Sequence, residues 1–297
     1  MMPRVLGMAV LLIAGCGVAA AQVDLDGTLA LLKGAETQKD VPQIKKLAVQ
    51  AITDGRKEVA AAAADKERAD FALSVQEYGE FALVNAALSA PAATKVDLLA
   101  ALEQVSPKSK YLVSAYPAYL QALRDTGAAA QVPAIAEKAL ANYPENEDLL
   151  SIALEDAATK QESDRVLSYA DRLVAVMTKR AKPDEMSAAD WEKRRAAMLG
   201  TGYFYAGRIY YTRNLYVQAD RSLRAALPFV RSNDAMLGMT LFLLGGANYQ
   251  IGAATNNKAK ILEGANYCTQ ASKVSFPQAQ DAWRQAQLMT TAASKIR

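Results

Sequence analysis

Two stretches in the C-terminal third of the chain carry small residues at matching places, and this repeat constrains the fold more than any other feature. The spacing between the two stretches is 45 residues. Helices can approach closely only where the side chains at their contact are small. Repeats of 20 to 50 residues are typical of arrays in which each hairpin buries its apolar face against its neighbours. The matching positions are Leu199-Gly200, Gly207, Ala219 and Ala226, followed by Leu244-Gly245, Gly252, Gly264 and Ala271.

The rest of the chain has the pattern of one amphipathic helix after another. Apolar residues recur at a spacing of three, as in Val96, Leu99, Leu102 and Val105, which is the spacing of a helical face. Capping boxes are expected at Thr94 with Asp97 and at Ser187 with Asp190, and one long helix is expected from residue 189 to about 213. We therefore predict an all-α fold. Pro, Gly or short polar residues predict helix ends at 89–91, 106–108, 126–127, 142–144, 181–183, 232–234 and 276–277.

Several hairpins resemble tetratricopeptide repeats. In one of them, Tyr116 and Leu120 precede a turn at Gly127, and Ala136, Ala139 and Pro144 follow; the next clear unit opens with Trp191, Leu199-Gly200 and Tyr203. The resemblance implies a right-handed superhelical solenoid of antiparallel helix hairpins over residues 76–277, with a concave groove. The last two units depart from the family by seven extra residues, and residues 252–257 are expected to form a loop.

The two flanks of this array are expected to be helical as well. Residues 22–75 are only weakly repeat-like, with an expected core of Leu29, Leu31, Leu32, Ile44 and Leu47. Residues 278–297 are predicted to form a capping helix over the last apolar face. The stripe expected to face the array consists of Ala279, Ala282, Trp283, Ala286 and Met289.

Residues 1–21 have the pattern of a signal peptide, with Arg4, then an apolar run, then small residues. Cleavage after Ala21 predicts a periplasmic or secreted protein. A second reading is a lipoprotein signal ending at Cys16, which would be lipidated and anchored to a membrane as an envelope assembly or adaptor protein. Contact with a membrane is expected only in that case.

The absence of histidine and the scarcity of cysteine limit the catalytic and metal sites that this chain can build. It has no histidine and two cysteines, Cys16 and Cys268, so the commonest general base and metal ligand is missing. We expect no metal, no cofactor and no enzyme activity. The pair Glu155-Asp156 is interpreted as solvated, and Cys268 as a core residue. An exported polysaccharide-active enzyme that uses carboxylates and tyrosines stays an alternative.

By the resemblance, the exposed faces of the first helix of each hairpin line the groove and bind a protein or peptide segment. The alternative is that the aromatic residues only pack and the arginines are only solvated. Residues 22–176 hold 16 basic and 23 acidic residues, whereas residues 177–297 hold 17 and 8, which favours an acidic partner for the C-terminal half. Nucleic acid is not expected. The groove residues implied are Gln121, Arg124, Phe204, Tyr205, Arg208, Tyr249 and Gln250.

Overall fold

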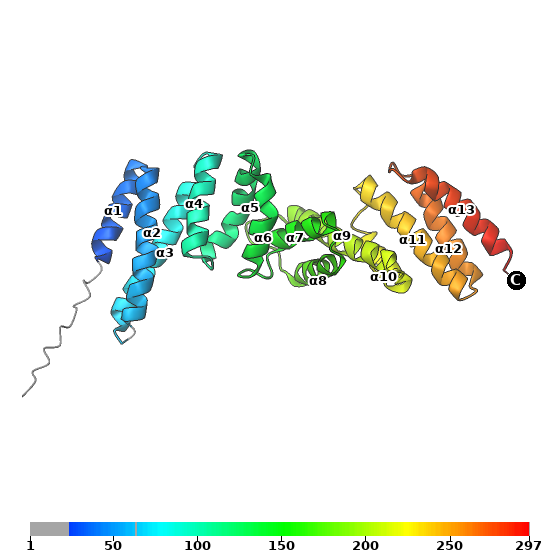
Figure 1. Cartoon of the computed structure of the whole chain (residues 1–297), viewed down its shortest axis with the longest axis horizontal. Coiled ribbons are helices and arrows are strands. Elements are labelled where there is room, and N and C mark those ends of the chain that lie inside the picture. Colours follow the sequence, from blue (N-terminus) through cyan, green and yellow to red (C-terminus); the bar gives the residue numbers. More distant parts are fainter. Residues whose placement is uncertain (1–23, 63, 297) are drawn as a thin grey trace, which may run out of the picture. The chain divides into compact units, whose positions relative to one another are not determined.

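The computed structural model describes residues 24–62 and 64–296, and these residues form thirteen α-helices, one short 3₁₀ helix and no strand (Figure 1). The prediction of an all-α chain is therefore confirmed. The chain divides into two compact units, one up to Ala86 and one from Ala87 onward. Each unit is described by itself.

The first unit consists of α1 (Leu25–Gln38), α2 (Val41–Ala61) and most of α3 (Lys66–Leu88). The first two helices begin where an aspartate accepts a hydrogen bond from a backbone N–H three residues on, at Asp24 and Asp40. Glycines let α2 and α3 approach closely: a Cβ atom on Gly55 would lie 2.8 Å from the carbonyl oxygen of Ala72, and one on Gly79 would lie equally close to that of Ala48.

The expected core of this first unit is only partly correct. Leu32 and Ile44 are buried, and Leu29 and Leu47 are half-buried. The prediction for Leu31 is wrong, because 64% of its surface is exposed. The buried stripe of α1 runs through Leu25, Thr28, Leu32 and Ala35, and Leu31 lies about 100° around the helix from Leu32.

The second unit contains ten helices and the 3₁₀ turn in its described residues. All seven predicted helix ends lie at observed ends, and the expected long helix is α9. The loop predicted at residues 252–257 is shorter than expected, because α11 continues to Ala254. Helices α7 and α8 are separated at Gln161, where no break was predicted, whereas the end of α9 at Thr212 agrees with the predicted bound near residue 213. The elements are α4 (Ala92–Val105), α5 (Lys110–Asp125), η1 (Ala129–Gln131), α6 (Val132–Leu140), α7 (Glu147–Thr159), α8 (Ser163–Lys179), α9 (Ala188–Thr212), α10 (Tyr216–Ala226), α11 (Asp234–Ala254), α12 (Lys258–Ala271) and α13 (Ala279–Ser294).

Packing in the second unit is local along the chain. From α6 onward each helix packs against the next, and the alternate helices α7 and α9, α9 and α11, and α11 and α13 also touch (Figure 1). The repeated small residues lie at these contacts. A Cβ atom on Gly264 would lie 2.6 Å from the carbonyl oxygen of Gly245, and one on Gly207 would lie 2.5 Å from Leu223 Cγ. Close approach therefore accounts for small side chains at these positions.

The two predicted capping boxes have different outcomes. Ser187 accepts a hydrogen bond from the Asp190 backbone N–H at 3.1 Å and donates one to the Asp190 carboxylate at 2.7 Å, so this box is confirmed. The box at Thr94 is wrong, because α4 already begins at Ala92 after Pro91 and Thr94 lies inside its first turn.

The C-terminal helix α13 packs mainly against α12. Its buried residues are Ala282, Ala286, Met289 and Ala293, which confirms most of the predicted stripe. Trp283 is an exception with 55% of its surface exposed. The contact uses one narrow side of α13 with mostly small residues, and the indole lies about 100° away from Ala282.

Candidate functional site

The seven predicted groove residues lie on α5, α9 and α11 of the second unit. Gln121 and Arg124 are exposed on α5, and Gln250 is exposed on α11. Tyr205, Arg208 and Tyr249 are half-buried. Gln121 donates a hydrogen bond to Asp125 on its own helix at 2.8 Å.

Phe204 occupies a different environment from the other six. Only 7% of its surface is exposed, and it packs in a core cluster with Ala226 and Val230. Its ring makes an edge contact with Tyr205, with ring centres 5.4 Å apart. The side chain of Phe204 is therefore a core residue in contact with Tyr205, and it offers little surface to a partner.

Four side chains from three alternate helices form an electrostatically connected row, which we call the α5–α7–α9 row: Arg124, Glu155, Tyr205 and Arg208. The guanidinium of Arg208 lies 5.6 Å from the centre of the Tyr205 ring, a cation–π geometry. Partial burial and the nearby carboxylate of Glu155 raise the pKa of Tyr205, and the charge of Arg208 opposes this rise.

Glu155 is the member of this row that sequence reasoning missed. Burial raises the pKa of its carboxyl, and the positive charge of Arg124 acts in the opposite direction. The side chain is nevertheless exposed to solvent.

A second polar cluster joins α10, α11 and α12, and its side chains form hydrogen bonds with one another. The Arg224 guanidinium donates hydrogen bonds to Asp220, Asn248, Glu263 and the Tyr267 hydroxyl, at 2.6 to 3.1 Å. Asn248 is fully buried, and its amide donates to Asp220 at 2.6 Å. Because each group already has a partner, we interpret this cluster as a structural connection between three helices.

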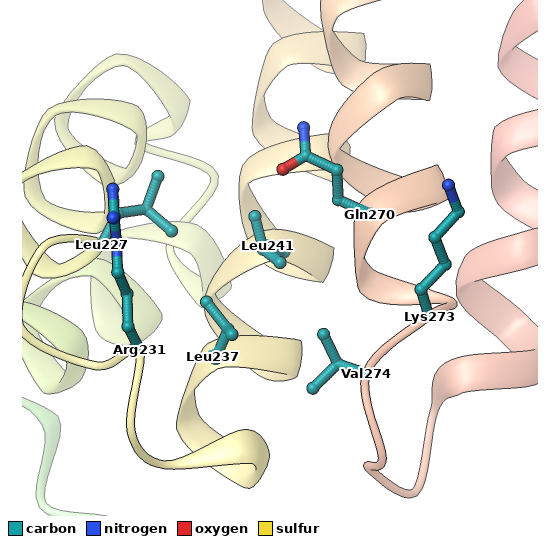
Figure 2. Close-up of a pocket in the computed structure, with 7 residues that line it drawn as sticks. All are labelled: Leu227, Arg231, Leu237, Leu241, Gln270, Lys273 and Val274. Carbon is teal, nitrogen blue, oxygen red and sulfur yellow. The ribbon is translucent and has the colours of Figure 1, made fainter.

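A hollow with an apolar floor lies at one end of the same three helices (Figure 2). Its volume is about 450 Å³, within the ~300–1,000 Å³ range typical of ligand pockets. We call it the aliphatic hollow. It is lined by Leu227, Leu237, Leu241 and Val274, with Arg231, Gln270 and Lys273 as its polar side chains. Sequence reasoning did not single out any of these residues.

Carboxylates do not converge in the hollows described here. The aliphatic hollow has no acidic lining residue, and a smaller one of about 240 Å³ has only Glu145. Cys268 is fully buried, and burial raises the pKa of its thiol to about 11, so its prediction as a core residue is confirmed. Cys16 and the predicted signal segment lie outside the described residues. Within the described ranges, no helix has the length and apolar character needed to cross a membrane.

No protein-family model matches this chain, and no curated protein matches it.

Proposed function

We propose that this protein is an exported scaffold that binds a protein or peptide segment on the surface formed by the α5–α7–α9 row. The proposal includes a right-handed solenoid of helix hairpins similar to tetratricopeptide repeats, and export directed by residues 1–21. The contacts between alternate helices support the stacked arrangement, because in hairpin arrays the equivalent helices of successive hairpins lie side by side.

The observation that carries the proposal is the electrostatic connection between Arg124, Glu155, Tyr205 and Arg208 across three helices. These four side chains combine a cation–π pair, a carboxylate and a second cation, supplied by three helices. Tyrosine and arginine contribute disproportionately to binding energy at protein interfaces. A preformed surface of this kind binds an extended segment with little reorganisation.

The test is affinity capture from the cell envelope of the source organism with the mature chain and two variants that make the same charge change. Arg208→Glu disrupts the row, whereas Arg221→Glu alters an exposed arginine on α10. We expect a captured protein to be lost with Arg208→Glu and retained with Arg221→Glu. Equal capture by both variants would refute the proposed site, and a captured polysaccharide that the wild type cleaves would refute the scaffold function.

A further inference from the structure

The aliphatic hollow is an uncovered part of the hydrophobic core. Leu241 is 5% exposed and belongs to a core cluster with Ala271 and Phe276. Leu227, Leu237 and Val274 pack against this cluster and are themselves half-buried. Apolar side chains of a bound molecule can therefore continue the packing of a core that already exists, which favours burial of aliphatic groups.

The rim of the hollow carries two positive charges without countercharges. Arg231 lies in the connection between α10 and α11, and Lys273 lies just after α12. Both are exposed, and among the described residues neither side chain has an ion-pair or hydrogen-bond partner. This differs from Arg224 nearby, which is paired with Asp220 and Glu263.

The two cations lie on opposite sides of the apolar floor. Figure 2 shows Leu237, Leu241 and Val274 between Arg231 and Lys273. A bound molecule can cover the apolar floor and form ion pairs with both cations only if it carries an aliphatic group between two negatively charged groups. A fatty acid has one negative end, so it can pair with only one of them.

Gln270 adds a hydrogen-bonding group to the same rim. Its carboxamide offers both a donor and an acceptor, and a peptide backbone presents the complementary pair at each residue. Aliphatic chains of lipids have no such groups. The polar rim therefore favours a peptide over a free fatty acid as the occupant.

From these observations we infer that the aliphatic hollow binds a peptide segment in which aliphatic side chains are flanked on both sides by acidic residues. The aliphatic side chains cover Leu237, Leu241 and Val274, and the acidic residues pair with Arg231 and Lys273. The choice of a peptide as occupant agrees with the proposed function, but the hollow is formed by other residues than the α5–α7–α9 row, so each can fail without the other.

The experiment uses fluorescence anisotropy with the mature chain and a labelled peptide Glu-Glu-Leu-Leu-Glu-Glu with both termini blocked. We expect saturable binding that weakens as NaCl rises, because exposed charges are screened. Reversal of both cations in Arg231→Glu/Lys273→Glu is expected to weaken binding at least tenfold, whereas Arg221→Glu leaves it within about twofold. Arg208→Glu is measured beside them to tell the hollow from the α5–α7–α9 row.

Peptide controls separate the two components of the recognition. Replacement of both leucines by serine tests the apolar floor, and replacement of the glutamates by lysine tests the rim; each is expected to abolish binding. Octanoate is added as a competitor to test a lipid-like occupant. Circular dichroism verifies that the double variant is folded, which is expected because both replaced residues are exposed.

Four results would overturn the inference, and the first three concern the hollow itself. They are the absence of saturable binding at low salt, equal affinity of the folded double variant, and displacement of the peptide by octanoate at a lower concentration than by unlabelled peptide. Loss of peptide binding in Arg208→Glu alone would instead assign the peptide to the α5–α7–α9 row and would also overturn it.

Discussion

Substitution of Gly264 by alanine tests the close approach of α11 and α12. The new Cβ atom would lie 2.6 Å from the Gly245 carbonyl oxygen and 3.0 Å from the Tyr249 backbone nitrogen. Both neighbours are backbone atoms of α11, so no rotation of a side chain relieves the contact. Ordinary van der Waals contact begins near 3.4 Å, which requires the two helices to separate by about 0.8 Å.

Two opposing terms set the size of the effect. Overpacking of a well-packed contact costs about 1–3 kcal/mol, and the upper part of this range applies because backbone must move. Alanine is better than glycine within a helix by about 1 kcal/mol. The free energy of unfolding is therefore expected to fall by about 2 kcal/mol, which corresponds to about 4–8 °C in Tm for a unit of this size.

Thermal unfolding followed by circular dichroism measures this change. Gly34→Ala in α1 provides the same chemical change at a place where no atom lies within 4 Å of the new Cβ, so it is expected to stabilise by up to about 1 kcal/mol. If Gly264→Ala has the wild-type Tm or a higher one, the two helices do not approach as closely as the structure indicates, and close packing is not the reason for the repeated small residues.

Two other predictions concern Cys268 and the capping boxes. Burial raises the pKa of the Cys268 thiol from about 9 to about 11, so between these pH values the folded chain keeps a proton that the unfolded chain releases. The free energy of unfolding therefore decreases with rising pH in this window, and urea unfolding should show a smaller decrease for Cys268→Ala; parallel curves would contradict this. Ser187→Ala should cost about 1 kcal/mol because it removes the α9 cap. Thr94→Ala, which removes no cap from α4, should leave Tm within about 1 °C by the same measurement.

The helix boundaries show what the sequence alone could predict. Ends marked by proline or glycine, such as those at Pro107 and Gly127, were correctly predicted. The end near Gln161 was not, because this residue adopts a positive φ angle of 60°. Residues other than glycine enter this region only occasionally, so their composition gives little warning of a turn.

The candidate sites depend more strongly on tertiary structure. The sequence pattern indicated Tyr205 and Arg208 on one helix, but the role of Glu155 depends on how α7 lies beside α9. The aliphatic hollow combines the end of α10, the first turns of α11 and the segment after α12. No spacing within one helix identifies such a combination, and the aliphatic residues that form its floor resemble ordinary core residues in the sequence.

Because α13 packs over Cys268, the reactivity of this thiol depends on whether α13 stays attached to α12. Cys268 belongs to a core cluster in which Ala286, Met289 and Ala293 come from α13. Detachment of this one terminal helix would uncover that cluster while the preceding helices stay folded. The rate at which a thiol reagent modifies Cys268 in native buffer would then measure how often the end of the array frays, independently of global unfolding.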